Sequence, residues 1–352
     1  MRAVALPMLV LAVSFPVLGL GLGLGLVACS SSPSGAAPTG SPAPTSPVSS
    51  EPAPGDGSAP GAVVPVADAG AGTDGDADAG TASTYRSSLS ICWTDATCPR
   101  AMIVAHGGDW SATTVPYGSM GAVIAAYDHG VDAVKLDVRV TKDNVPVISH
   151  SSPIEIYESL DCYNQRIEDM TAAQVTGCHF VQKASESFQR LDTVLSYLRG
   201  KMVVQLTVKL PADYARTISE VNALSAQDFA FLEVSTAELQ TVLPPIPGSN
   251  QIYWLVNVGS TLSDIDVLLD TVKNPRAFMV EMDPSAQTST LVTTRLHPAK
   301  VRAFTYDSSA TASVAELQAF FDQGFDVVSA NTTPNNEAAR VAVNTARGVT
   351  PP

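Results

Sequence analysis

Basic residues are scarce in this chain of 352 residues. Lysine and arginine together number 20, against 34 aspartate and glutamate residues, so the formal net charge at pH 7 is −14. Proteins that bind nucleic acid neutralise its phosphates with clusters of basic side chains. We therefore expect no nucleic acid among the partners of this protein.

Two common sequence signatures are also missing. The apolar run 101–106 ends in His106-Gly107-Gly108, which is too short to be a glycine-rich loop of the dinucleotide-binding kind. The spacing of the four cysteines after Cys29 matches no common zinc pattern, although His179 leaves zinc as an alternative. An even number of cysteines in an exported protein favours disulfides, and sequence order favours Cys92–Cys98 and Cys162–Cys178.

The first 28 residues are typical of a targeting segment. Arg2 precedes an apolar run that continues to Val27, and small residues then lead to Cys29. This segment resembles a bacterial lipoprotein signal, in which Cys29 becomes the lipidated first residue. The alternative is a single transmembrane anchor, which the many glycines disfavour. We expect an exported protein that a lipid at Cys29 anchors to a membrane of the cell envelope.

Residues 29–88 contain almost no large apolar side chain and consist mainly of Ser, Pro, Gly, Ala and Asp. Such a segment cannot bury enough surface to offset its loss of conformational entropy. We expect a disordered, partly extended tether that precedes a folded domain at 89–345.

Eight apolar, β-branched runs follow in the predicted domain. They lie at 101–106, 133–140, 202–210, 229–234, 251–258, 276–283, 301–307 and 326–331, and helical patterns separate most of them. This alternation predicts an α/β fold, a single (β/α)8 TIM-type barrel. An open doubly wound sheet is the alternative.

Two histidines and a carboxylate are predicted to converge at one end of the barrel. His106 ends the first strand, Asp137 lies on the second, and a turn at 142–144 returns the chain to His150. Counting from that turn places His150 opposite Lys135. Lys209 ends the third strand, and active sites of such barrels lie at these strand ends. The segment 151–187, with its predicted disulfide, is expected to cover the mouth.

The order of these motifs resembles that of the glycerophosphodiester phosphodiesterase family. The family pattern contains His-Arg-Gly, Pro-Glu-Asn, Glu-Leu-Asp-Val, Thr-Lys-Asp-Gly, His-Asp and a later Glu-x-Lys. The corresponding residues here are His106-Gly107-Gly108, Pro116-Tyr117-Gly118, Lys135-Leu136-Asp137-Val138, Thr141-Lys142-Asp143-Asn144, His150-Ser151 and Thr207-Val208-Lys209. The resemblance implies a TIM barrel that acts on phosphodiesters.

The departures from the family pattern fall on its metal site. The resemblance assigns the cation to Glu, Asp and Glu, and these positions are Lys135, Asp137 and Thr207 here. Only Asp137 remains as a candidate ligand for calcium or magnesium, which usually need more than one carboxylate. We therefore expect no metal cofactor. Asp137 is equally well interpreted as an ion-pair partner of Lys135 or Lys209.

The sequence thus predicts a protein that binds or hydrolyses a small-molecule phosphodiester, either a glycerophosphodiester or a phospholipid headgroup. In this interpretation His106 and His150 transfer protons, because paired histidines can act as general acid and base. Lys135 and Lys209 would bind the phosphate. The alternative is a catalytically inactive barrel that acts as a ligand-binding or structural surface protein.

Overall fold

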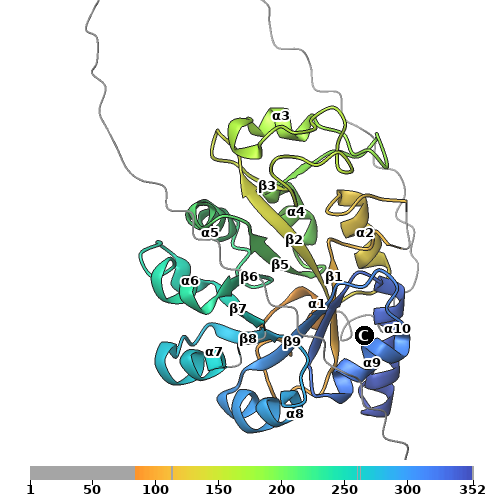
Figure 1. Cartoon of the computed structure of the whole chain (residues 1–352), viewed down its shortest axis with the longest axis vertical. Helices are drawn as coiled ribbons and strands as arrows, with labels where there is room; N and C mark the ends of the chain where they lie inside the picture. Colours follow the sequence, from red (N-terminus) through yellow and green to blue (C-terminus); the bar gives the residue numbers. More distant parts are fainter. Residues whose placement is uncertain (1–83, 112–113, 260, 262, 351–352) are drawn as a thin grey trace, which may run out of the picture. The chain divides into compact units, whose positions relative to one another are not determined.

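Eight parallel strands form a closed barrel in residues 84–111, 114–259, 261 and 263–350, which the computed structural model describes. Strand β1 pairs with β10 on one side and with β2 on the other, and the strands between follow in the order β10-β9-β8-β7-β6-β5-β2 (Figure 1). The predicted (β/α)8 barrel is confirmed, and the open sheet is excluded because β1 is paired on both sides. The barrel strands are β1 (Met102–His106), β2 (Ala133–Val140), β5 (Val203–Val208), β6 (Ala230–Ser235), β7 (Tyr253–Gly259), β8 (Ala277–Met282), β9 (Arg302–Asp307) and β10 (Val327–Ala330).

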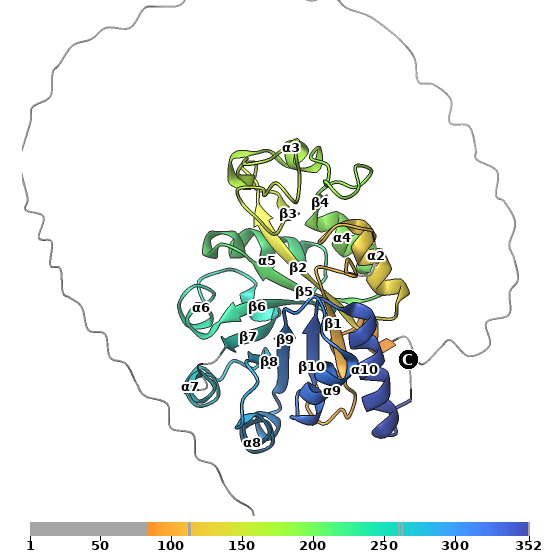
Figure 2. The same ribbon diagram turned by 45° about the vertical axis from the view of Figure 1, so that its right-hand side comes forward.

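Helices surround the barrel on its outer side (Figures 1 and 2). Helix α6, for example, begins at the N-cap Ser235, whose side chain accepts a hydrogen bond from the backbone N–H of Glu238, and the side chain of Glu238 bonds back in a capping box. The α-helices are α1 (Thr84–Ser87), α2 (Met120–Asp128), α3 (Ala172–Thr176), α4 (Leu191–Leu198), α5 (Tyr214–Ala223), α6 (Thr236–Thr241), α7 (Ser263–Asp266), α8 (Thr288–Leu291), α9 (Val314–Asp322) and α10 (Thr333–Ala346). Helices α7 and α8 continue as π-helical turns, Val267–Val272 and Val292–Leu296, and 3-10 turns lie at Ile167–Asp169, Pro211–Asp213, Ser249–Gln251 and His297–Ala299.

The hairpin that follows β2 corrects the predicted register by one residue. Strand β3 (Pro146–Ile148) pairs antiparallel with β2 so that Val138 lies opposite Ile148, and the ladder ends there. This register places His150 one residue away from its predicted position opposite Lys135. The reason is the turn, which has three residues between Thr141 and Val145 and is therefore centred on residue 143.

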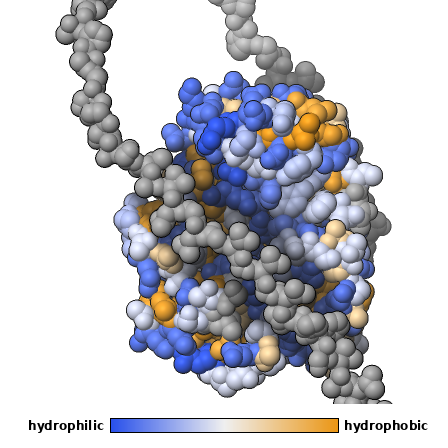
Figure 3. Space-filling view, viewed as in Figure 1, coloured by the Kyte–Doolittle hydropathy of each residue, from blue (hydrophilic) through white to orange (hydrophobic). Residues whose placement is uncertain are grey.

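The segment 151–187 folds beside the hairpin around a small core of its own. Its buried apolar residues include Ile154, Met170 and Phe180, which pack with Phe188, and a disulfide joins Cys162 to Cys178 as sequence order favoured. A short strand, β4 (Gln189–Arg190), then pairs with β3. Figures 1 and 2 show this segment, with α3, extending beyond the barrel. Figure 3 shows apolar atoms gathered on the same part of the molecule.

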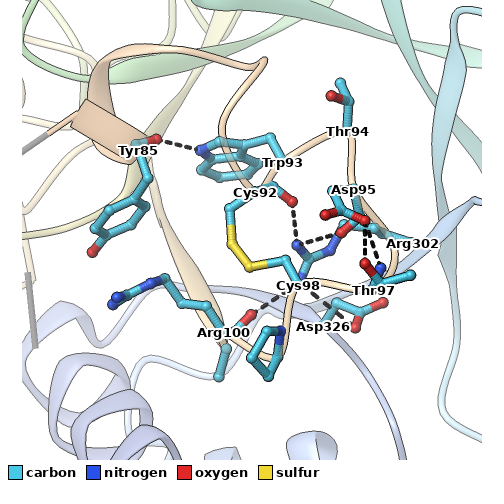
Figure 4. The surroundings of a disulfide bond; sticks show 12 residues. Tyr85, Cys92, Trp93, Thr94, Asp95, Thr97, Cys98, Arg100, Arg302 and Asp326 are labelled. Atoms are coloured by element: carbon cyan, nitrogen blue, oxygen red, sulfur yellow. Dashed lines mark hydrogen bonds and ion pairs between the residues drawn. A yellow bond between two sulfur atoms is a disulfide. The ribbon is translucent and has the colours of Figure 1, made fainter. Parts of the chain in front are cut away.

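An N-terminal segment closes the opposite end of the barrel, where the strands begin. Trp93 is buried against Phe231 of β6, and the second predicted disulfide joins Cys92 to Cys98 (Figure 4). Arg302, at the start of β9, donates hydrogen bonds to backbone carbonyls of this segment (Figure 4). Tyr85 is already part of the core, so the folded domain begins before the predicted boundary at residue 89.

The predicted signal segment and Cys29 lie outside the described residues, as does most of the predicted tether. Within the part of the chain that is described, no helix combines the length and the apolar composition required to cross a membrane.

Candidate active site

Polar side chains from several strands meet at the carboxyl end of the barrel, where active sites of this fold lie. They surround a cavity of about 240 Å³ whose lining includes His106, Lys135, Thr207, Lys209 and Glu233. The strand register accounts for this grouping, because His106 lies beside Lys135 and Thr207 lies beside Glu233. The structure therefore brings both predicted lysines and the first predicted histidine to one cavity.

Asp137 lies at the centre of a cluster of charges. Its side chain is 1% exposed, and Oδ1 contacts Nζ of Lys135 at 2.5 Å and Nζ of Lys209 at 2.7 Å. Its other oxygen, Oδ2, accepts a hydrogen bond of 2.7 Å from the Tyr117 hydroxyl. Burial raises the pKa of Asp137, but the two ammonium groups more than offset this and hold that pKa well below its usual range. Asp137 is thus the ion-pair partner of both lysines.

Tyr117 is a central residue of the site that the sequence reasoning missed. Besides its bond to Asp137, its hydroxyl oxygen lies 3.3 Å from Nε2 of His106, and its ring contacts the rings of both His106 and His150 at 5.3 and 5.4 Å between centroids. Burial, and next the charge of Asp137, raises the pKa of Tyr117 well above its usual value, so the phenol remains protonated. The signal that could have identified it is its place in Pro116-Tyr117-Gly118, where the family pattern has a glutamate.

His106 is held in one orientation by polar contacts to Nδ1. The Asn331 side-chain oxygen lies 2.7 Å from Nδ1 and the Tyr306 hydroxyl lies 3.1 Å from it. Because the amide oxygen only accepts, Nδ1 carries the proton and Nε2 has a free lone pair when the ring is neutral. Burial, together with the charge of Lys135, lowers the pKa of His106 to about 4. The imidazole ring is therefore neutral, and able to accept a proton, at pH values above about 4.

His150 lies at the outer edge of the site. It follows β3, is exposed, and its Nδ1 lies 3.2 Å from the hydroxyl oxygen of Ser151. Its backbone carbonyl accepts hydrogen bonds from Arg139, which fixes the position of this residue. Partial burial lowers the pKa of His150 below its usual value. Tyr117, which touches both rings, links His150 to the rest of the site.

Two glutamates line the far side of the cavity. Glu233 accepts hydrogen bonds from Gln205, Thr207 and Asn257 at 3.1, 2.7 and 3.0 Å. Burial, and then the neighbouring Glu233, raises the pKa of Glu281 well above its usual value. The surroundings of Glu281 therefore favour its neutral form. Nothing in the sequence pointed to a role for this residue.

The side chains at the three positions that the family resemblance assigns to metal ligands do not fit a divalent cation. Lys135 places an ammonium group there, and the hydroxyl of Thr207 donates to Glu233. Both oxygens of Asp137 already bind cationic or hydroxyl donors. Calcium and magnesium require several oxygen ligands, and no group of three or more His, Cys, Asp or Glu side chains among the described residues is arranged to hold a metal.

Comparisons with known proteins agree with the motif order. The profile of the glycerophosphoryl diester phosphodiesterase family matches residues 111–329. No curated protein matches the chain. Among solved structures, a glycerophosphodiester phosphodiesterase from Agrobacterium tumefaciens superposes with a TM-score of 0.56 at 17% identity, over 68% of this chain and 99% of the other.

Two further structures show the same fold. A glycerophosphoryl diester phosphodiesterase from Parabacteroides distasonis has a TM-score of 0.59 at 15% identity, over 74% of this chain and 93% of the other. A phosphodiesterase from Oleispira antarctica, solved with its product sn-glycerol-3-phosphate, has a TM-score of 0.53 at 16% identity, over 69% and 98% of the two chains.

Proposed function

Because the chain belongs to the glycerophosphoryl diester phosphodiesterase family, we propose that it cleaves a phosphodiester without a divalent cation. The observation that carries this proposal is the cluster in which Lys135 and Lys209 share one oxygen of Asp137 beside His106. One carboxylate and two ammonium groups give this cluster of three side chains a net positive charge.

Lys135 and Lys209 form the phosphate-binding part of the site. Each ammonium group has three N–H donors, and the ion pair with Asp137 uses one on each lysine. Lys135 also approaches the Tyr117 hydroxyl at 3.5 Å. The remaining donors are available to phosphate oxygens in the cavity that both lysines line. Asp137 keeps the two like charges together and sets their spacing.

The two histidines supply proton transfer. His106 Nε2 removes the proton from the hydroxyl group that attacks the phosphodiester, and the oxygen of this group forms a bond to phosphorus. The bond from phosphorus to the leaving alcohol breaks, and His150 donates a proton to that oxygen. His106 suits the role of base because its low pKa keeps it neutral. The negative charge of a bound phosphodiester raises the pKa of His150 and so favours its acid form.

One contact favours a second candidate function, which is binding without turnover. The Tyr117 hydroxyl oxygen lies 3.3 Å from His106 Nε2, where the attacking hydroxyl has to bind. His106 can act as a base only after Tyr117 moves or is displaced by the substrate. A protein in which Tyr117 stays in place would hold the phosphodiester on its lysines and leave it intact.

An assay of the full chain on glycerophosphodiesters and phosphatidylinositol tests the proposal, with EDTA and with added calcium or magnesium. We expect hydrolysis in EDTA, and a loss of about 10²–10⁴-fold in turnover for His106→Ala. His297→Ala is the control, because His297 pairs with Asp326 outside the site. A strict requirement for a divalent cation would overturn the proposal. Binding without hydrolysis that weakens in Lys209→Met would select the second candidate.

We also propose that the protein is exported and anchored through a lipid on Cys29, so that the barrel acts at the cell envelope. The apolar segment that ends at Val27 before Cys29 supports this proposal. Two disulfides in the folded domain fit an oxidising compartment.

A further inference from the structure

A second and larger cavity lies near the polar one, with Tyr117 between them. It has a volume of about 560 Å³ and lies between the loop that follows β1 and the segment 151–187. Its lining is mainly aromatic and aliphatic, with Trp110, Val115, Pro116, Tyr117, Tyr157 and Phe180. Pockets of this size and composition bind small molecules with large apolar groups.

Tyr117 links the two cavities, because it lines the apolar one and its hydroxyl contacts His106 and Lys135, which line the polar one. The Tyr117 ring lines the apolar cavity, while its hydroxyl bonds to Asp137 among the lysines. A narrow recess lined by Asp137, His150 and Phe180, among others, adjoins the apolar cavity and extends to the carboxylate that pairs with both lysines. A molecule whose phosphate binds Lys135 and Lys209 would therefore direct one of its substituents past Tyr117 into the apolar cavity.

The walls of the apolar cavity are held by contacts that need no ligand. Phe180 is buried and stacks on Phe188 with 4.6 Å between ring centroids, and it follows the disulfide residue Cys178 by two positions. On the opposite wall, the indole N–H of Trp110 donates to the backbone carbonyl of His106 at 2.8 Å. The cavity is thus a preformed feature of the fold, in which little entropy is lost on binding.

Apolar surface continues outward from the cavity. Five large apolar side chains of the segment 151–187 are more than 40% exposed: Ile156, Tyr157, Leu160, Tyr163 and Val181. Single exposed apolar residues are ordinary, but a group of them next to a cavity marks a surface that contacts an apolar ligand. Figure 3 shows the apolar atoms gathered on this part of the molecule.

We propose that the apolar cavity binds an acyl or alkyl chain of the substrate, so that the protein acts on amphiphilic phosphodiesters. This inference rests on the proposed function, since it needs a phosphodiester at the lysine cluster. The phosphate binds Lys135 and Lys209, and the chain lies against Trp110, Tyr117 and Phe180. The free amphiphile and a lipid in a bilayer present the same chemistry to this site.

A series of glycerophosphodiesters whose alkyl substituent grows from two to twelve carbons tests the inference on the full chain, with each compound below its micelle concentration. We expect kcat/KM, or the association constant if there is no turnover, to rise about fourfold per methylene, as transfer of methylene groups from water predicts. The increase should stop when the cavity is full.

Variants at the cavity wall identify the site. Thr114→Trp fills the cavity and Tyr157→Ala removes part of its wall, so each should lower the ratio of long-chain to short-chain kcat/KM by about fifteenfold, the equivalent of two methylenes. Tyr163→Ala is the matched control. Tyr163 and Tyr157 are 53% and 54% exposed on the same segment, and only Tyr157 lines the cavity. The ratio in Tyr163→Ala should equal that of the unmodified protein.

The possible outcomes distinguish a failure of the apolar site from a failure of the proposed function. Short-chain phosphodiesters that bind or react, with no dependence on chain length, would overturn the apolar site and leave the proposed function standing. A chain-length dependence that survives Thr114→Trp and Tyr157→Ala would also overturn it. Failure to bind any phosphodiester would overturn both. Supplying the long-chain substrate in zwitterionic vesicles distinguishes the source of the substrate. A faster reaction than with monomers assigns the site to bilayer lipid, and a slower reaction assigns it to the free amphiphile. Both results support the inference.

Discussion

The ring of Tyr117 occupies the space beside Gly107 in which a side chain would otherwise lie. Gly107 has φ +72°, and a Cβ atom added to it would overlap the Tyr117 ring. In the family pattern, arginine stands at the position of Gly107 and glutamate at that of Tyr117. The loss of the arginine side chain and the gain of the aromatic ring are therefore one structural change, because the two larger side chains do not fit together.

Gly107→Ala should destabilise the protein by about 2–4 kcal/mol, since it adds a left-handed alanine and an overlap with Tyr117. Gly200→Ala is the matched control, because Gly200 has φ +70° with no atom within 4 Å of the added Cβ. We expect about 1 kcal/mol there. Denaturant unfolding measures both, and the cost of Gly107→Ala should fall in a Tyr117→Ala background. Equal costs in both backgrounds would contradict the contact.

The pH dependence of kcat/KM should be bell-shaped with a maximum on the acid side of neutrality. His106 must be neutral to act as a base, so activity rises with pH through its pKa of about 4. His150 must be protonated to act as an acid, and its lowered pKa makes activity fall again below the usual histidine value of 6.5. His150→Ala should abolish the falling limb. A maximum above pH 7 would contradict these roles.

Restoring two carboxylates should create a metal site. The unmodified chain should bind neither calcium nor magnesium in calorimetric titration, because an ammonium group occupies the position of one ligand. Lys135→Glu with Thr207→Glu gives the family's Glu-Asp-Glu set and should bind calcium. Lys135→Gln with Thr207→Gln is the uncharged control. Micromolar binding by the unmodified chain that disappears in Asp137→Asn would show that our interpretation of the site is wrong.

Removal of the disulfide in the segment 151–187 should lower stability. Replacing Cys162 and Cys178 by serine frees a loop with a sequence separation of 16 and should cost about 3 kcal/mol in the chain-entropy description. The corresponding change at Cys92 and Cys98, whose separation is 6, should cost about 2 kcal/mol. Urea unfolding with and without reductant measures both. Unchanged midpoints would show that the loops are fixed by other contacts.

Cys29→Ser should release the protein from the membrane. In a bacterial host, the unmodified chain should sediment with membranes and yield an N-terminal peptide that carries acyl chains on Cys29. The serine variant should remain unprocessed and carry no acyl mass. Mass spectrometry of the N-terminal peptide decides the question, and an unmodified Cys29 in the mature protein would reject the lipid anchor.

The barrel could be predicted from the sequence because each strand carries its own signal. In β5, for example, Val203, Val204, Thr207 and Val208 are β-branched, and a short run rich in such residues is typical of a buried strand. The hairpin register was predicted wrongly by one residue although the turn at 142–144 was predicted correctly. Pairing His150 with Lys135 placed the centre of the turn between residues 142 and 143, whereas the observed ladder is centred on residue 143 and Asn144 takes a left-handed conformation.

The grouping of three predicted site residues could be anticipated from the sequence, while their roles stay predictions. His106, Lys135 and Lys209 line one cavity because each lies on a motif of a barrel strand, and the fold brings these strands together. Tyr117 was matched to a family motif but given no role, because its role depends on the glycine against which it packs and on the carboxylate to which it donates. Such contacts join residues far apart in the sequence and leave no periodic pattern.

The N-terminal segment that closes the barrel also determines at which end of the barrel a fusion partner, tag or linker is attached. Tyr85 bonds to Asp132 just before β2, and Leu89 bonds to the backbone of Asp228 just before β6, so the described chain begins at the face opposite the mouth. Fusion partners, affinity tags or immobilisation linkers placed upstream of Thr84 therefore join the barrel at its closed end. Immobilised in this way, the protein keeps its mouth open to substrates in solution.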